Sequence, residues 1–139
     1  MTTTRVAVTE WHGSLLEGSG RVTLESSGMG TFDVTWASRA EQPEGRTSPE
    51  ELIAAAHASC FSMAFSSRLA KAGTPATTLT TRAEVDFQPG EGITGIRLHV
   101  TGDAPGADAD AFAAMAEDAK ANCPVSQALA AVPITLTVG

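Results

Sequence analysis

The sequence has no tyrosine and little aromatic content of any kind, because five phenylalanines and two tryptophans bring the aromatic share of its 139 residues to only 5%. The core must therefore be built mainly from aliphatic side chains and methionine. No apolar run approaches the roughly 18 residues that a membrane-spanning helix needs. The first residues, Met1–Trp11, also lack the cationic start and apolar stretch of a secretory signal. These absences predict a cytoplasmic protein with no membrane segment.

Basic residues are also scarce, since 9 lysines and arginines stand against 16 aspartates and glutamates and leave a formal net charge of -7. A charge of this sign repels phosphate-rich surfaces. We therefore expect neither nucleic acid nor an anionic membrane as a partner.

Cysteine occurs only twice, as Cys60 and Cys123. Two cysteines in a reducing compartment seldom form a permanent disulfide and are more often free, catalytic or metal-bound. The rest of the composition, 42% hydrophobic and 18% charged, is that of an ordinary globular protein. With no internal repeat and no linker-like segment, the length predicts a single domain over residues 1–139.

Alternation of polar and apolar residues predicts β-strands in both halves of the chain, with an antiparallel meander in the first 40 residues. Glycine-rich segments separate these strands and supply the turns. A polar loop is expected from Ala40 to Thr47. The expected strands cover residues 5–8, 21–24, 31–36, 79–87, 96–100 and 133–138.

A long helix is predicted over residues 49–71. Ser48 is a suitable N-cap, Pro49 suits the first helical position, and Glu51 stands where a capping box requires an acid. Gly73 and the proline that follows it end the helix. Its middle part carries almost no charge and is small or apolar on every side, which is typical of a buried helix. We expect its own sheet to cover one side and a second subunit to cover the other.

Two shorter helices should follow the second pair of strands. Asp110 is expected to cap the first, and Pro124 opens the second directly after Cys123. The order of strands, helix, strands, helices and strand predicts an α+β fold, with antiparallel sheets around a long buried central helix and an intertwined homodimer.

The two cysteines differ in setting. A buried cysteine such as Cys60 is by itself more often an inert small hydrophobe than a nucleophile. Cys123 stands at a helix start, where backbone N–H groups favour a thiolate. One buried and one activated cysteine together suggest a redox pair.

The runs around these residues resemble the OsmC/Ohr family of organic hydroperoxide and stress-induced peroxidases, and the OsmC branch in particular. The resemblance covers nearly the whole chain and includes both cysteine motifs in the right order. The matching runs are Trp11-x-Gly13, Gly18-x-Gly20, the segment 48–58, its continuation 60–64, and the segment 119–129.

The resemblance implies a role for each of several residues. It makes Cys60 the peroxidatic thiol, Cys123 the resolving thiol, and Glu50 the acid that orients an arginine. That arginine falls on Arg39, with Arg46 or Arg21 as the alternatives, because the loop before the helix is one residue longer than the family pattern and residue 40 is not aromatic.

The implied reaction needs these residue types. Only a thiolate attacks an O–O bond, so Cys60 requires a nearby cation, and a guanidinium stays charged while it holds both sulfur and peroxide oxygen. The resulting sulfenic acid condenses with Cys123 to a disulfide. The resemblance implies an external dithiol such as a lipoyl group as reductant, with no metal or prosthetic group. An apolar wall near Cys60, to which Phe61, Met63, Phe65 and Met115 would contribute although they are core residues first, would favour alkyl or lipid hydroperoxides over hydrogen peroxide.

Helix geometry adds a constraint on the acid. Glu50 and Cys60 are ten residues apart, which is about 15 Å along a straight helix. Either the arginine spans part of that distance, or Glu50 of a second subunit reaches Cys60 across antiparallel central helices. We favour the second arrangement.

Other functions are weaker interpretations of the same residues. His57 lies one turn before Cys60, but no C-x-x-C or H-x-x-x-H pair accompanies it, so we expect a hydrogen-bonded core or interface histidine rather than a zinc ligand. Two further alternatives stay open: a non-enzymatic module that binds a lipid-like ligand, and a general thiol-disulfide oxidoreductase.

Overall fold

The computed structural model describes residues 1–139, which form two compact units, Met1–Leu52 and Ile53–Gly139. The predicted fold class is confirmed: strands and helices form an α+β protein with a long central helix, α2 (Pro49–Lys71). None of the helices is both long and apolar enough to cross a bilayer.

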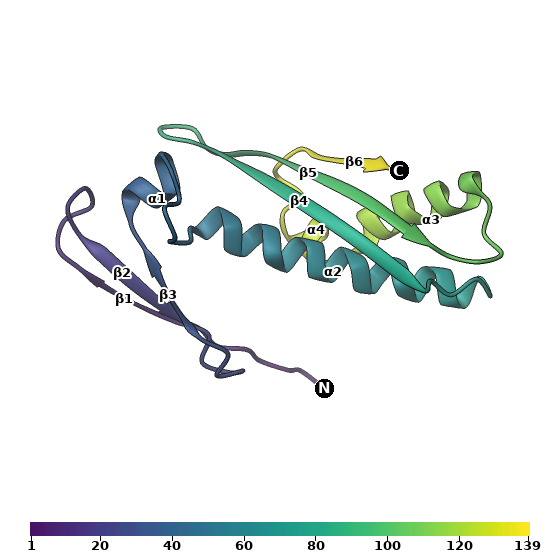
Figure 1. Ribbon diagram of the computed structural model, residues 1–139, viewed down its shortest axis with the longest axis horizontal. Coiled ribbons are helices and arrows are strands. Elements are labelled where there is room, and N and C mark those ends of the chain that lie inside the picture. Colours follow the sequence, from purple (N-terminus) through teal and green to yellow (C-terminus); the bar gives the residue numbers. More distant parts are fainter. The chain divides into compact units, whose positions relative to one another are not determined.

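The first unit contains a three-stranded antiparallel meander, as the turn pattern predicted (Figure 1). Its strands are β1 (Val8–His12), β2 (Ser19–Thr23) and β3 (Thr31–Val34). The first strand begins later than the alternation over residues 5–8 predicted. The reason is that the carbonyl of Val6 accepts the backbone N–H groups of Glu25 and Ser26, so this segment pairs irregularly with the chain beyond β2.

A short helix, α1 (Trp36–Ala40), replaces the end of the predicted strand and the start of the predicted loop. Thr35 and Ser38 form a reciprocal capping box, in which each side-chain oxygen accepts the backbone N–H of the other residue at 3.0 Å. The sequence pattern missed this helix because serine takes the place of the usual glutamate or glutamine at the third position of the box.

Helix α2 begins and ends where the sequence predicted. The hydroxyl of Ser48 accepts the backbone N–H of Glu51 at 3.1 Å. The capping box is only half formed, however, because the Glu51 carboxylate accepts the Thr47 hydroxyl instead, at 2.6 Å. Gly73 follows the helix with φ of 80°, a left-handed conformation that glycine adopts without steric cost.

The second unit pairs a long hairpin with two helices and a final strand. The hairpin strands are β4 (Thr78–Gln88) and β5 (Gly92–Asp103), and β6 (Ile134–Val138) pairs with β5 in parallel. This parallel pair accompanies the antiparallel pairing that we expected. It arises because α3 (Ala109–Asn122) and α4 (Pro124–Ala128) form the crossover between β5 and β6. The N-cap of α3 is Asp108 rather than Asp110, since its carboxylate accepts the Ala111 N–H at 2.7 Å.

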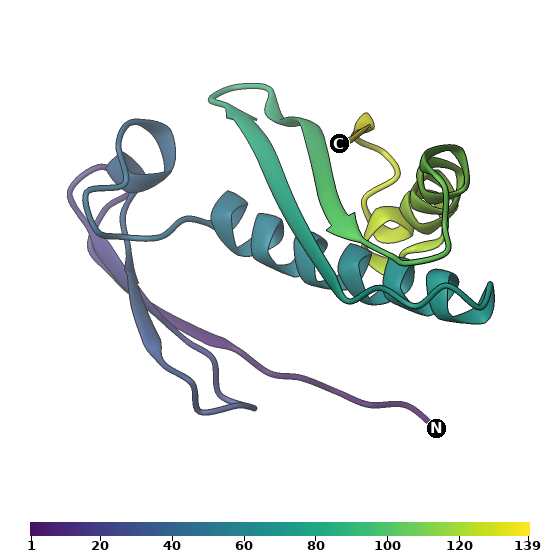
Figure 2. The same ribbon diagram turned by 45° about the vertical axis from the view of Figure 1, so that its right-hand side comes forward.

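The core of the second unit lies between α2, the sheet and α3 (Figure 2). Phe61, Phe65 and Leu69 recur every four residues along α2 and are fully buried against Leu98 and other side chains of β5 and α3. The opposite side of α2 is exposed, and Met63 there is 73% accessible. The prediction that the chain's own sheet covers one side of α2 is therefore confirmed.

Candidate active site

The two cysteines meet inside the second unit. Cys60 projects from the middle of α2, and Cys123 occupies the single extended residue between α3 and α4, where it is the N-cap of α4. Both are free thiols and they are hydrogen-bonded to each other; Cys123 is completely buried and Cys60 is half-buried. Cys60 is therefore the more accessible of the two residues, and Cys123 is shielded from water.

The surroundings of the two cysteines shift the pKa values of their thiols in opposite directions. Burial raises the pKa of Cys60, and contact with Cys123 raises it further. Burial also acts to raise the pKa of Cys123, but hydrogen bonds from Cys60, from Ser126 and from the backbone N–H of Val125 outweigh it, so this pKa is lowered. When one of the two thiols in this unit loses its proton, the thiolate is therefore favoured on Cys123. The Cys60 thiol then donates a hydrogen bond to it.

His57 and Ser126 form a buried pair beside the cysteines. The His57 Nε2 atom and the Ser126 hydroxyl are 2.7 Å apart, and both residues are buried. Burial lowers the pKa of His57, so the ring stays neutral. The interpretation of His57 as a hydrogen-bonded core histidine is confirmed. The structure contains no group of three or more histidine, cysteine, aspartate or glutamate side chains placed to hold a metal ion.

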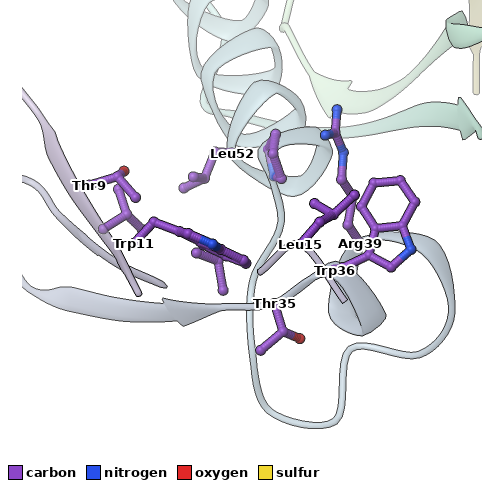
Figure 3. A pocket seen from close by; sticks show the side chains of 10 residues that line it. Thr9, Trp11, Leu15, Thr35, Trp36, Arg39 and Leu52 are labelled. Carbon is purple, nitrogen blue, oxygen red and sulfur yellow. The ribbon is translucent and has the colours of Figure 1, made fainter. Parts of the chain in front are cut away.

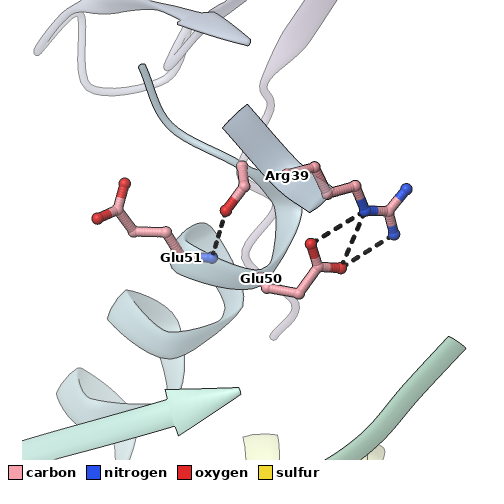
Figure 4. Close-up of polar contacts among 4 residues, drawn as sticks. Arg39, Glu50 and Glu51 are labelled. Carbon is pink, nitrogen blue, oxygen red and sulfur yellow. Dashed lines mark hydrogen bonds and ion pairs between the residues drawn. The ribbon is translucent and has the colours of Figure 1, made fainter. Parts of the chain in front are cut away.

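Arg39 and Glu50 form the principal ion pair of the first unit (Figure 4). The Arg39 Nη2 and Nε atoms donate to the two Glu50 oxygens at 2.9 and 3.0 Å, a bidentate arrangement. The Glu50 side chain is only 8% exposed and that of Arg39 is 31% exposed. The Glu50 carboxylate thus fixes the orientation of the Arg39 guanidinium.

The alternative arginines have other surroundings. Arg21 on β2 lies 3.5 Å from Asp33 on β3, and both side chains are largely exposed. Arg46 lies in the exposed loop before α2, where its backbone N–H donates to the Pro43 carbonyl.

A pocket of about 350 Å³ lies in the first unit, with Arg39 in its wall (Figure 3). Both tryptophans of the chain line it, Trp11 from β1 and Trp36 from α1. The remaining lining residues are Thr9, Leu15, Val22, Val34, Thr35, Pro49 and Leu52. The sequence analysis did not assign these residues to a site; the only signal was that an aromatic-poor chain keeps two tryptophans near its start.

Gly20 makes room for one of these tryptophans. It pairs with Trp11 across β1 and β2 and lies within the strand, although the sequence placed it in a turn. A Cβ atom on Gly20 would stand 2.7 Å from the Trp11 ring and 3.0 Å from a Val34 methyl. The Trp11 Nε1–H donates to the Gly13 carbonyl at 3.1 Å. The glycines of this segment therefore hold the indole in the pocket wall.

None of the four residues that were predicted as core residues and possible wall residues near Cys60 lines this pocket. Phe61 and Phe65 are fully buried in the second unit, and Met115 is half-buried against the same core. Met63 is exposed.

Known proteins resemble this chain over most of its length. The model of the OsmC-like protein family matches residues 42–137. Peroxiredoxin OsmC of Escherichia coli is 41% identical over 134 residues, which covers 94% of this chain and 93% of that protein.

The chain belongs to the OsmC family.

Solved structures show the same fold at lower identity. An organic hydroperoxide resistance protein OsmC from Legionella pneumophila covers 99% of each chain with a TM-score of 0.73 and 24% identity. The organic hydroperoxide resistance protein OhrB of Bacillus subtilis covers 96% of this chain and 98% of its own, with a TM-score of 0.71 and 22% identity. This OsmC-family chain is a cysteine-based peroxidase, as its 41% sequence identity to the Escherichia coli peroxiredoxin over most of both chains indicates.

Proposed function

We propose that this OsmC-family chain reduces organic hydroperoxides, and hydrogen peroxide comparably or less well, by a two-cysteine mechanism. The observation that carries the proposal is the contact between the half-buried Cys60 and the buried Cys123. Cys60 is the sulfur that a substrate can reach, and Cys123 is the sulfur that a newly formed sulfenic acid meets. The geometry therefore suits peroxidatic and resolving roles in that order.

The proposed steps balance without any prosthetic group. The Cys60 thiolate attacks the O–O bond, takes the terminal oxygen as a sulfenic acid, and the alkoxide leaves as an alcohol after it gains a proton. The Cys123 sulfur then attacks the Cys60 sulfur, the S–S bond forms, and the S–O bond breaks with loss of water. An external dithiol, such as a lipoyl group, reduces the disulfide and becomes a disulfide itself. We place this cycle in the cytoplasm, where thiols are kept reduced.

Arg39 is our candidate for the cation that activates Cys60. Within their own unit the cysteines favour the thiolate on Cys123, so a positive charge beside Cys60 is needed to reverse this order. Arg39 is suited to this role because a nearly buried Glu50 holds it by two hydrogen bonds, whereas Arg21 has only a 3.5 Å ion pair with a largely exposed Asp33. Its guanidinium has further donors for a peroxide oxygen.

The pocket of the first unit supports an alkyl or lipid hydroperoxide as substrate. The indoles of Trp11 and Trp36 offer apolar surface, and Arg39 adds one fixed charge in the same wall. Ligand sites commonly combine an apolar lining with a few polar groups that orient the ligand. We propose that the alkyl part of the substrate contacts the indoles and the peroxide group contacts the guanidinium.

We further propose that one OsmC-like domain per subunit, residues 1–139, functions as a homodimer. The exposed side of α2 carries small and apolar residues without charge, among them Ala55, Ser59, Met63 and Ala70. In the first unit every residue of β1 is exposed, and a three-stranded sheet needs a covered apolar face to be stable. A second copy would cover such surfaces.

The dimer predicts a single species of twice the chain mass in sedimentation velocity at micromolar concentration. This mass should persist at high salt, because the surfaces concerned are apolar rather than charged. A monomer at that concentration that still turns over hydroperoxide would contradict the proposal.

Titration of the fully reduced protein with cumene hydroperoxide tests the mechanism. One equivalent should convert both thiols to the Cys60–Cys123 disulfide, as shown by intact mass and thiol count. In Cys123→Ser, the same equivalent should leave Cys60 as a sulfenic acid, which excess peroxide over-oxidises to the sulfinic acid. Free thiols in the presence of excess peroxide would instead favour the lipid-binding module, and turnover of protein disulfides without peroxide consumption would favour the general oxidoreductase.

A further inference from the structure

The buried pair formed by His57 and Ser126 is not explained by packing alone. A polar pair placed inside an apolar core is costly unless its hydrogen bonds are satisfied. Nε2 of His57 is bonded to the Ser126 hydroxyl at 2.7 Å, but its Nδ1 is buried and has no partner. The core thus tolerates one unsatisfied ring nitrogen in order to keep the other one against Ser126.

The orphaned nitrogen determines which atom carries the ring proton. The ring is neutral, so one nitrogen bears a proton and the other a lone pair. An unpaired buried N–H is rarer and costlier than an unpaired acceptor. The proton therefore belongs on Nε2, which donates it to the Ser126 oxygen.

This assignment directs the Ser126 proton toward the resolving thiol. A hydroxyl has one proton to donate and can accept two hydrogen bonds. Because His57 already donates to Ser126, the Ser126 O–H is available to donate, and the Ser126 side chain is hydrogen-bonded to the Cys123 sulfur. The backbone N–H groups of Val125 and Ser126 also act to lower the pKa of Cys123.

We propose that Ser126, held by His57, is a positioning residue for the resolving step, because its hydroxyl donates a hydrogen bond to the Cys123 sulfur as that sulfur becomes a nucleophile. The inference rests on the two-cysteine function proposed above. It assigns a purpose to the Cys-Pro-x-Ser run, in which Cys123 occupies the N-cap position of α4 and Ser126 stands three residues later in the first turn of the same helix.

Formation of the Cys60–Cys123 disulfide leaves the protons of Ser126 and His57 in place. Cys123 attacks the sulfur of the Cys60 sulfenic acid, the S–S bond forms and the S–O bond breaks. The departing hydroxide takes the proton that Cys123 loses and leaves as water. Ser126 and His57 keep their own protons and stabilise charge on the Cys123 sulfur before the attack.

Few titratable groups surround this sulfur. The groups near it on α2 are Cys60 and His57, and those on α4 are Ser126 and the backbone N–H groups. On α3, Lys120 is paired with Glu117 at 3.2 Å. On β5, the ring of the half-buried His99 is hydrogen-bonded to the carbonyl of Gly139.

The experiment separates the two sulfur reactions in the full-length protein. Sulfenic acid formation and disulfide formation are followed by acid quench and intact mass after one equivalent of cumene hydroperoxide. In Ser126→Ala we expect disulfide formation to slow by about tenfold or more, since a hydrogen bond to a charged group is lost, while sulfenic acid formation stays within about twofold. Ser126→Thr, which keeps the hydroxyl, should restore most of the rate. Ser62→Ala is the matched control, because it removes another 2.7 Å hydroxyl pair of α2, that with Thr81.

A second measurement needs no peroxide. In the Cys60→Ser background Cys123 is the only thiol, and its ionisation is followed by the ultraviolet absorbance of the thiolate against pH. Adding Ser126→Ala or His57→Leu should move the midpoint to higher pH, whereas His57→Gln, which keeps a neutral N–H donor, should move it less.

The two proposals fail in different ways. An unchanged midpoint and an unchanged rate of disulfide formation in Ser126→Ala would overturn the role of Ser126, and so would an equal slowing in Ser62→Ala. Failure of wild-type Cys60 to form any sulfenic acid would overturn the two-cysteine function, while the absorbance titration would still decide whether Ser126 acts on Cys123.

Discussion

Replacing Cys60 by serine is expected to reduce hydroperoxide turnover about a thousandfold or more, to the background rate of the reductant alone. A serine hydroxyl does not ionise near neutral pH, and its oxygen does not accept the peroxide oxygen as sulfur does. The measurement is consumption of cumene hydroperoxide with dihydrolipoamide as the dithiol.

Cys123→Ser is the matched control for this loss. It removes the other thiol of the same pair but leaves Cys60 half-buried on α2. It should therefore still consume the first equivalent of peroxide at a rate near that of the wild type and then stop. Comparable multiple turnover in Cys60→Ser would show that Cys60 is only a core residue.

Replacing Arg39 by methionine is expected to slow the reaction of Cys60 with hydroperoxide by about a hundredfold, because methionine keeps the length of the side chain but not the charge or its donors. The second-order rate constant is measured under single-turnover conditions. Arg46→Met and Arg21→Met are the comparison variants and should stay within about threefold of wild type, since the net-charge change is the same in all three.

Arg39→Met also leaves Glu50 nearly buried without its partner, which destabilises the fold. The double variant Arg39→Met/Glu50→Gln removes that unpaired charge. It should recover stability in urea unfolding without recovering the rate. If it recovers the rate as well, Arg39 supports the fold and not the chemistry; a large loss in Arg46→Met or Arg21→Met would transfer the role to that arginine.

Mixing two inactive variants tests which subunit supplies the arginine. A heterodimer of Cys60→Ser and Arg39→Met contains one intact site if Arg39 of one subunit serves Cys60 of the other, and none if both come from the same subunit. Random mixing should then restore about a quarter of the wild-type activity, because half of the dimers are mixed and each has one working site. No recovery in mixed dimers would show that each subunit completes its own site.

Elements with strong local signals were predictable from the sequence. Helix α2 was placed correctly at both ends, because Ser48, Pro49 and Gly73 act on the residues next to them. The long hairpin followed from alternation, since each strand has one face on the core. The position of Cys123 at the start of α4 followed from Pro124.

Elements that depend on distant or unusual partners were not predictable. The helix α1 was missed because its capping box uses Ser38 in place of an acid. The parallel pairing of β6 with β5 depends on where α3 and α4 return the chain, and no property of residues 134–138 encodes it.

The sequence alone determined helix α2, most of the strands and the family. These features depend on neighbouring residues or on motifs read in order along the chain. The tertiary structure decided which groups meet: Cys60 with Cys123, His57 with Ser126, and Arg39 with Glu50. Ser126 lies 69 positions from His57, and no periodicity connects residues so far apart. Only the packing of α4 against α2 brings the Ser126 hydroxyl to the His57 ring.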